Sequence, residues 1–301
     1  MSAGTSEGAS PAAAASGSTA STASTAGLGM GPALLFCPGD RADRFQKAAD
    51  RADAVILDLE DAVGAESKTA ARAAIRAAAL DPERTIVRVQ DASAAGFGDD
   101  LAAVAASPFR TVMLAKAESA EQVDAVAATV PGARVVVLVE TARGVLAVES
   151  LVAHQAVVGV MWGAEDLVAS LGGTSSRDAA GAYRDVAMHT RSRILLAAGA
   201  HGVTAIDAIR TDIADLDGAH AEAVDAAASG FGAKAAIHPN HVEPYRRAFA
   251  PTAEQLDQAR RILAAAEATP GVFSFEGRMV DEPILRHARS VVARAGAAGA
   301  A

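Results

Sequence analysis

The sequence predicts an α/β protein in which eight parallel strands close into a barrel, followed by a C-terminal helical appendage. Eight short apolar segments of strand type follow one another between residues 33 and 239, and Ala-rich stretches of helical type separate them. The strand segments are almost continuously apolar, which is typical of parallel strands covered on both faces. Eight such units over about 220 residues have the size of a (β/α)8, or TIM, barrel.

The first turn between a strand and a helix argues against the main alternative, a doubly wound open sheet. This turn, CPGDRADRF at 37–45, lacks the G-x-G-x-x-G that dinucleotide-binding sheets carry there. Clear helical stretches lie at 41–52 and 119–130. The barrel strands are expected at 33–37, 54–60, 84–89, 110–116, 133–140, 156–163, 202–207 and 233–239.

The chain divides into three parts. Residues 1–30 are rich in Ser, Thr, Ala and Gly and contain no Lys, Arg or aromatic residue, so we expect a disordered low-complexity tail without a targeting signal. Residues 31–250 are expected to form the barrel, which would be the catalytic domain. Residues 251–301 lie beyond the eighth strand, and we expect this C-terminal extension to contribute to a neighbouring subunit.

The extension has its own pattern of elements. An amphipathic helix is expected at 252–268, and a turn or hairpin at 269–280. Asp281 opens a final helix, and Pro283 lies in its first turn, where proline is tolerated.

Composition argues against several classes of function. The formal net charge of -9 argues against a nucleic-acid-binding protein, which usually carries a basic stripe. No apolar run approaches the roughly 20 residues of a membrane helix. The single cysteine, Cys37, allows neither an internal disulfide nor a zinc cluster. We therefore expect a cytoplasmic protein in which Cys37 is a small buried apolar residue.

Charged residues collect where the strands end, which is where barrels of this kind carry their chemistry. Carboxylates with an arginine and a lysine among them suit a hard divalent cation and an anionic substrate, and two carboxylates with substrate oxygens and water describe a Mg2+ site. The absence of His/Cys clustering disfavours zinc. The residues are Asp58, Glu60, Asp61, Arg88, Lys116, Glu140, Glu165, Asp166, Asp207 and His238.

Each of these residues also has a purely structural interpretation. Glu140 and Asp166 have the positions of helix caps, and Arg88 could pair with the acids that end the second strand. Lys116, Asp207 and His238 are open to structural roles as well. Residue type and spacing alone thus predict a barrel with an acidic metal site.

Six motifs in a fixed order carry a resemblance to a known family. The chain resembles the citrate lyase beta-subunit-like (CitE-like) group of the HpcH/HpaI aldolase superfamily, which is related to malyl-CoA and citramalyl-CoA lyases. The resemblance runs from about Leu34 to Arg289. The motifs are LLFCPGDRADRFQKAADRADAVILDLEDAV, VRVQ, LVETARGV, WGAEDLVASLGG, GFGAKAAIHPNHV and GRMVDEPILRHAR.

The resemblance implies roles for residues of the barrel mouth. Glu140 and Asp166 match the two Mg2+ ligands, and Arg88 matches an arginine that contacts the oxygens of the keto-acid fragment. Glu60 and Asp61 match acids that surround the metal and the arginine. Gly163 and Ala164 are suited to let the backbone approach a carboxylate oxygen of the substrate.

Further roles implied by the resemblance lie at the two ends of the chain. Arg41 matches a basic residue near the coenzyme A phosphates, and Lys47 is expected to assist it. Asp281 matches an acid that comes from the adjacent subunit of a trimer and handles the proton at the acetyl-CoA methyl carbon. This chain departs from the family pattern at two positions of the barrel mouth. The family often has Pro-Lys at 115–116 and Asn at 90, whereas this chain has Ala115 and Gln90.

The resemblance implies a Mg-dependent carbon–carbon lyase. It would cleave a short 3-hydroxyacyl-CoA thioester, of the citramalyl-, malyl- or hydroxymethylglutaryl-CoA type, to acetyl-CoA and a keto acid, as a homotrimer or a multiple of it. One alternative is a class II aldolase acting on free hydroxy-keto acids. Others are a citryl-thioester lyase subunit of a citrate lyase complex and a non-enzymatic CoA-binding scaffold.

Overall fold

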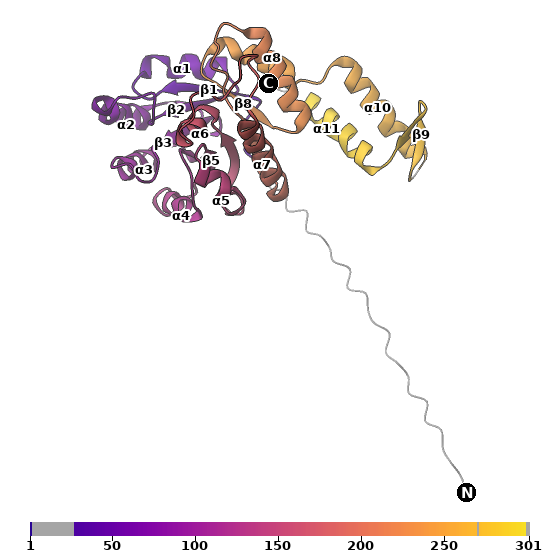
Figure 1. The fold of residues 1–301 in the computed structure, drawn as a ribbon, viewed down its shortest axis with the longest axis horizontal. Helices are drawn as coiled ribbons and strands as arrows, with labels where there is room; N and C mark the ends of the chain where they lie inside the picture. Colours follow the sequence, from indigo (N-terminus) through magenta and orange to yellow (C-terminus); the bar gives the residue numbers. More distant parts are fainter. Residues whose placement is uncertain (2–26, 270, 299–301) are drawn as a thin grey trace.

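Eight parallel strands form a closed barrel with helices around it (Figure 1). The computed structural model describes residue 1 and the ranges 27–269 and 271–298. The strands pair in chain order, and the first closes the barrel against the eighth, so the predicted fold is confirmed and the open sheet is wrong. The strands are β1 (Ala33–Pro38), β2 (Ala54–Asp58), β3 (Thr85–Val89), β4 (Thr111–Leu114), β5 (Arg134–Val139), β6 (Val157–Trp162), β7 (Thr204–Asp207) and β8 (Ala233–Ala236).

Helices follow the strands and cover the outside of the barrel (Figure 1). Two of them, α6 and α7, follow β6, and a loop at 171–184 joins them. The helices are α1 (Ala42–Arg51), α2 (Lys68–Ala77), α3 (Phe97–Ala105), α4 (Ala120–Thr129), α5 (Ala142–Val152), α6 (Ala164–Ser170), α7 (Asp185–His201), α8 (Leu216–Ser229), α9 (Val242–Phe249), α10 (Ala253–Ala268) and α11 (Glu282–Ala298).

Alternate residues of each strand face the barrel interior and the helix layer. In β2, Ile56 belongs to the interior core, whereas Val55 and Leu57 belong to the core beneath the helices. Because large apolar side chains fill the interior, a site can form only at the strand ends. These interior side chains include Leu34, Ile56, Ile86, Met113, Val136, Leu138, Met161 and Ile206.

The chain just before β1 closes the amino-terminal end of the barrel. Leu28 and Met30 are buried in the interior core, and the Leu28 N–H donates to Thr204 Oγ1 at the start of β7 (2.9 Å). Arg134 at the start of β5 donates to the Leu28 carbonyl (2.8 Å). The predicted tail boundary at residue 30 is therefore too late, because apolar side chains before it complete the core. The prediction for 2–26 lies outside the described residues.

The C-terminal extension is a helical hairpin that projects to one side of the barrel (Figure 1). Thr252 and Gln255 form a capping box at the start of α10, which packs against α11. Between these helices, β9 (Phe273–Phe275) and β10 (Arg278–Val280) pair in antiparallel fashion. The turn residues Glu276 and Gly277 both have positive φ, as a type I′ turn requires. The expected helix, hairpin and helix are all present.

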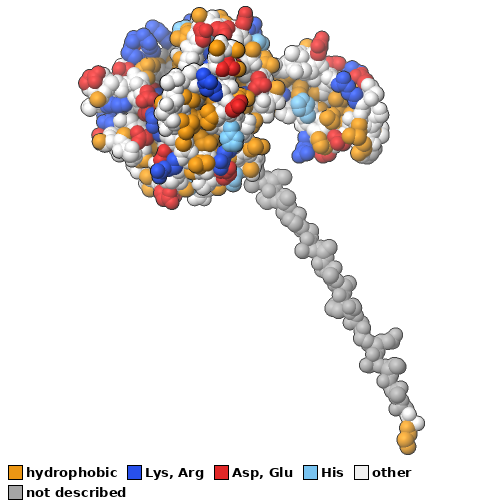
Figure 2. Space-filling view, viewed as in Figure 1, with side chains coloured by type: hydrophobic (Ala, Val, Ile, Leu, Met, Phe, Trp, Pro, Cys, Tyr) orange, Lys and Arg blue, Asp and Glu red, His pale blue; other side chains and the backbone are white. Residues whose placement is uncertain are grey.

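The outer surface carries charges of both signs. Figure 2 shows acidic and basic side chains interspersed over the face of the barrel that it presents. A continuous basic stripe of the kind that nucleic-acid-binding proteins use is not visible on that face. Among the described residues, no helix is both long and apolar enough to span a membrane.

Cys37 lies at the carboxyl end of β1 and is buried, as expected. Burial raises the pKa of its thiol from 9.0 to about 11. At pH 8 the reactive thiolate is therefore about a hundredfold scarcer than in the unfolded chain.

We expect iodoacetamide to alkylate native Cys37 at least about a hundredfold more slowly than Cys37 in urea, as followed by mass spectrometry. Equal rates in the two states would contradict this burial.

Candidate active site

An ion-pair cluster at the ends of β2 and β3 holds Arg88. The two strands pair in a register that sets Asp58 beside Arg88. The guanidinium donates from Nε to Asp58 Oδ1 (2.7 Å) and from Nη2 to Asp58 Oδ2 (2.6 Å), and its Nη1 lies 2.9 Å from Glu60 Oε2. Asp58 also accepts the backbone N–H groups of Glu60 and Ala62. Asp58 is therefore a positioning residue for Arg88.

Arg88 retains hydrogen-bonding capacity for a ligand. Burial acts to lower its pKa, but the ion pair with Asp58 and the charges of Glu60 and Glu140 together hold the pKa above its ordinary value, so the side chain is a permanent cation. Of the five N–H groups of a guanidinium, the contacts with Asp58 and Glu60 occupy three. Among the described residues no hydrogen bond or ion pair involves the two others, so they can donate to the oxygens of a substrate.

Phe36 supports Arg88 and was not singled out from the sequence. Its ring centroid lies 4.9 Å from the guanidinium carbon, within the range of a cation–π contact. A phenylalanine within an apolar strand gives no chemical signal. Successive side chains of β1 alternate between its two faces, so Leu34 and Phe36 lie on the same face. This alternation is the sequence pattern that could have indicated Phe36.

Lys116 links the acids of β2 to those that follow β5 and β6. Its backbone is left-handed (φ 49°), which is uncommon for a residue other than glycine. In this conformation its N–H donates to Glu140 Oε1 (3.1 Å), while its ammonium contacts Glu60 and lies 3.6 Å from Asp166 Oδ1. Burial acts against the ammonium, but the bond to Glu60 raises the pKa of Lys116. Lys116 therefore belongs to the site cluster.

Glu60 and Asp61 lie around this cluster. The Glu60 carboxylate contacts both Arg88 and Lys116, and Asp61 Oδ2 lies 3.6 Å from the Lys116 ammonium. Glu60 is buried, and this burial raises the pKa of its carboxyl. Asp61 is more exposed, and its carboxyl is the outermost acid of the group.

Glu140 and Asp166 form a pair of carboxylates. Glu140 follows β5 and is 2% exposed, and Asp166 lies in the first turn of α6. Burial, and next the charge of Asp166, raises the pKa of Glu140 to about 8. Two neighbouring carboxylates repel each other unless a cation compensates them. Because both are oxygen ligands, Mg2+ fits this pair better than zinc does.

The backbone approaches Glu140 closely at Gly163. A Cβ at this position would lie 2.6 Å from Glu140 Oε2, so only glycine fits at this entry to α6, which begins with Ala164. Within 27–269 and 271–298, no group of three or more His, Cys, Asp or Glu side chains is arranged to hold a metal ion. A cation on Glu140 and Asp166 would therefore take its other ligands from substrate and water.

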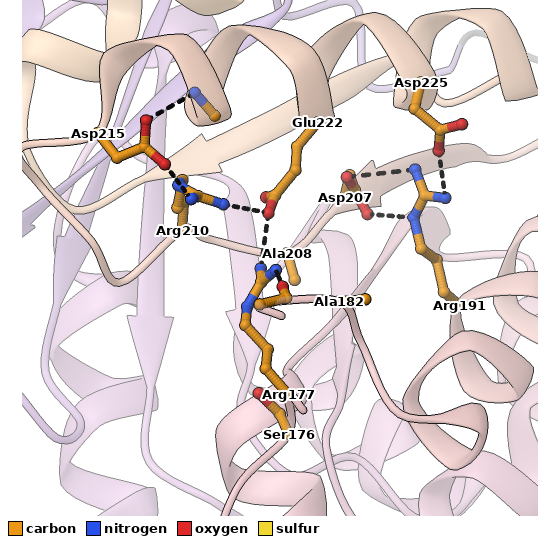
Figure 3. A network of polar contacts seen from close by, with 12 residues as sticks. Ser176, Arg177, Ala182, Arg191, Asp207, Ala208, Arg210, Asp215, Glu222 and Asp225 are labelled. Atoms are coloured by element: carbon orange, nitrogen blue, oxygen red, sulfur yellow. Dashed lines mark hydrogen bonds and ion pairs between the residues drawn. The ribbon is translucent and has the colours of Figure 1, made fainter. Parts of the chain in front are cut away.

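Asp207 and His238 have structural roles. Asp207 is buried at the end of β7, in the polar network that Figure 3 shows. It accepts from Arg191 Nε (2.9 Å) and Lys234 Nζ (3.0 Å). His238 accepts the backbone N–H of Asn240 through Nδ1 (3.2 Å). These contacts agree with the structural interpretation of both residues.

Three of the expected site residues lie apart from the cluster. Arg41 precedes α1 and pairs with Asp43 (3.0 Å), and Lys47 is exposed on the same helix. Asp281 precedes α11, and its Oδ1 lies 3.4 Å from the Ile284 nitrogen. No hydrogen bond or ion pair among the described residues joins these three to the cluster. Their roles stay predictions.

Several known proteins are similar to this chain along most of its length. Residues 33–239 match the family described as HpcH/HpaI aldolase/citrate lyase. A citrate lyase subunit beta-like protein of Mycobacterium tuberculosis is 53% identical over 268 residues, which cover 89% of this chain and 97% of that protein. A (3S)-malyl-CoA thioesterase of Cereibacter sphaeroides is 33% identical and a mitochondrial citramalyl-CoA lyase of Rattus norvegicus 29% identical. These cover 89% and 86% of this chain, and 95% and 84% of those proteins.

A solved structure is similar in fold as well as in sequence. It is the protein CitE of Mycobacterium tuberculosis in complex with magnesium, acetoacetate and coenzyme A. The match has a TM-score of 0.84 at 52% identity and covers 89% of this chain and 99% of that chain.

Proposed function

Because the chain belongs to the HpcH/HpaI aldolase/citrate lyase family, we propose that it cleaves a short 3-hydroxyacyl-CoA thioester to acetyl-CoA and a keto acid. The enzyme is a carbon–carbon lyase, and its cofactor is Mg2+. Citramalyl-, malyl- and hydroxymethylglutaryl-CoA are the substrate types we propose. The observation that carries the proposal is the buried carboxylate of Glu140 beside the partly exposed carboxylate of Asp166, within one cluster with Arg88.

Glu140 and Asp166 would hold the magnesium ion. Two observations support this assignment. Burial, and next the charge of Asp166, raises the pKa of Glu140, so a cation between the two carboxylates would be stabilised. Gly163 leaves room for the Glu140 carboxylate, because a Cβ there would clash with it. When bound, Mg2+ supplies Lewis acidity at the hydroxyl and carboxylate oxygens of the keto-acid part of the substrate. Glu60 and Asp61 would balance the positive charge of Arg88 and Lys116 around it.

Arg88 would bind the keto-acid part of the substrate. Its two remaining N–H groups can donate to the oxygens on which negative charge develops as the carbon–carbon bond breaks. Asp58 holds both Nε and Nη2, so the guanidinium is oriented before a substrate arrives. Gly163 and Ala164 would let the backbone approach a substrate carboxylate.

Asp281 would supply the proton that completes cleavage. Water would take the proton of the 3-hydroxyl, and an electron pair of that oxygen would form the carbonyl of the keto acid. The bond between C2 and C3 would break, and its electron pair would form the thioester enolate. The carboxylic acid of Asp281 then protonates the methylene carbon to give acetyl-CoA, and in the condensation direction its carboxylate is the base. Because Asp281 lies on the projecting extension, we propose that it serves the site of a neighbouring subunit in a trimer.

Arg41 and Lys47 would bind the coenzyme A phosphates at the rim of the barrel. Arg41 shares its charge with one exposed acid, Asp43, whereas no ion pair among the described residues involves Lys47.

We propose residues 31–250 as the catalytic domain and 251–301 as the part that reaches the neighbouring subunit. The single cysteine is in keeping with a cytoplasmic enzyme.

A product assay tests the proposed function. The protein is incubated with Mg2+ and citramalyl-, malyl- or hydroxymethylglutaryl-CoA, and acetyl-CoA, free CoA and keto acids are separated by chromatography. We expect acetyl-CoA and the keto acid in equal amounts. Free CoA with an intact hydroxy acid would instead assign a thioesterase, the activity in the name of one relative. Turnover of only free hydroxy-keto acids would assign an aldolase.

Mixing two inactive variants tests the shared site. Glu140→Gln removes a proposed metal ligand and Asp281→Asn removes the proposed acid, so each homo-oligomer should be inactive. Random 1:1 reassembly into trimers should restore about a quarter of the sites, since a site then takes Glu140 from one chain and Asp281 from the next. Activity that stays at the level of the separate variants would argue against donation across subunits.

A further inference from the structure

The loop between α6 and α7 folds into a small hairpin next to the carboxylate site. Arg177 and Tyr183 face each other in an antiparallel bridge. The Arg184 N–H donates to the Ser176 carbonyl (2.9 Å), and the Asp178 N–H donates to the Ala182 carbonyl (2.9 Å). We call residues 176–184 the α6–α7 hairpin.

This hairpin is bonded to α6, the helix that carries Asp166. The Ser176 hydroxyl is buried and lies 2.6 Å from Glu165 Oε1, to which it donates. Glu165 precedes Asp166 in the first turn of α6. A shift of the hairpin would therefore move the turn that carries a proposed metal ligand.

Arg177 fixes the hairpin to α8. Its guanidinium stacks 3.7 Å from the ring centroid of Tyr183, and its Nη2 lies 2.8 Å from Glu222 Oε1 (Figure 3). Tyr183 in turn meets the buried ring of Trp162, which ends β6. Within 27–269 and 271–298, Glu222 is the one carboxylate at ion-pair distance from Arg177.

Glu222 also meets two other cations, but both of these have a second carboxylate. Arg210 contacts Asp215 as well as Glu222 (Figure 3). Lys234 lies 3.5 Å from Glu222 Oε2 and 3.0 Å from Asp207 Oδ2. Loss of the Glu222 charge would therefore leave Arg177 without a carboxylate while the other two cations keep theirs.

We propose that the Arg177–Glu222 ion pair is a positioning device for the metal site. The pair holds the α6–α7 hairpin, and the hairpin holds the first turn of α6, and so Asp166, through Ser176 and Glu165. This inference rests on the proposed role of Asp166 as a magnesium ligand. It makes Glu222 and Arg177 positioning residues that touch neither metal nor substrate.

Magnesium titration of the full-length enzyme tests the proposal. Glu222→Gln and Arg177→Met should each raise the Kd for Mg2+ about fivefold or more by calorimetry, since partners that orient a ligand tune metal affinity. Asp225→Asn is the matched control, because it removes an acid from the same helix while its partner Arg191 keeps Asp207. This control should bind Mg2+ as wild type does.

Amide hydrogen exchange tests the positioning role of the Arg177–Glu222 pair without magnesium. Glu222→Gln should speed exchange at the amides of Asp178, Gly181 and Arg184 and in the first turn of α6, whereas Asp225→Asn should not. Melting temperatures show whether Glu222→Gln is folded. If it is not, the Arg177→Met variant, which keeps a side chain over Tyr183, provides the same two readouts.

A double-mutant cycle separates positioning from general destabilisation. Ser176→Ala cuts only the bond between the hairpin and α6, so it should weaken Mg2+ binding to the same extent as Glu222→Gln. The double variant should be no weaker than either single variant, because both act along one path. Additive losses, or an unchanged Kd in Glu222→Gln, would overturn the proposal. A wild-type enzyme that binds no Mg2+ would instead refute the proposed function.

Discussion

Glu140→Gln should abolish lyase activity and stabilise the fold. Removing one of two protein ligands of the proposed magnesium site should lower kcat at least about a hundredfold and remove measurable Mg2+ binding. The fold should gain stability because the Glu140 carboxyl must either remain charged against burial and Asp166 or take up a proton on folding, whereas Gln does neither. Activity assays, calorimetry and urea unfolding in EDTA measure the three effects.

The stability effect has a defined pH dependence. Burial and Asp166 raise the pKa of Glu140 from 4.5 to about 8, so the folded protein binds this proton more tightly than the unfolded chain does. In EDTA the stability of the wild type should therefore fall between about pH 5 and pH 8, and that of Glu140→Gln should fall less. Parallel pH profiles of the two proteins would contradict the crowded carboxylate pair.

Arg88→Met should cost both activity and stability. The loss of a fixed cation at the substrate oxygens should lower kcat/KM by about a hundredfold to a thousandfold. The buried Asp58 carboxylate would keep two backbone donors but lose its cation, which should cost roughly 3 kcal/mol of unfolding free energy. Steady-state kinetics and urea unfolding measure the two losses.

A second variant separates the two losses. In Arg88→Met/Asp58→Asn the unpaired buried charge is gone, so much of the stability should return. The activity should stay low, because no cation faces the substrate. Recovery of activity together with stability would show that Arg88 acts only through the fold and would contradict its proposed contact with substrate.

The fold was predictable because its signals are local and repeated. Eight apolar segments with helical stretches between them predicted the strand order of the closed barrel. The boundary of the tail was placed too late because Leu28 and Met30 are two isolated apolar residues in a small-residue segment. Their burial depends on the space left at the amino-terminal end of the barrel, and no local pattern records that space.

The candidate site was predictable in part. Because parallel strands end at one mouth, Glu60, Arg88, Glu140 and Asp166 could be expected together from the strand ends alone. The role of Lys116 was open from the sequence, since its contacts depend on a left-handed backbone that the residue type does not suggest. The Arg177–Glu222 pair joins residues 45 positions apart in the chain, and only the folded structure brings them together.

The position of the bound cation decides whether Glu140 and Asp166 form the magnesium site. A crystal of the full-length enzyme grown with Mn2+ in place of Mg2+ and measured at the manganese absorption edge locates the ion by its anomalous scattering. We predict one peak in the barrel mouth, about 2.1 Å from one oxygen each of Glu140 and Asp166. A peak on other acids, such as Asp61 or Glu165, or no peak in the mouth at saturating Mn2+, would contradict this prediction.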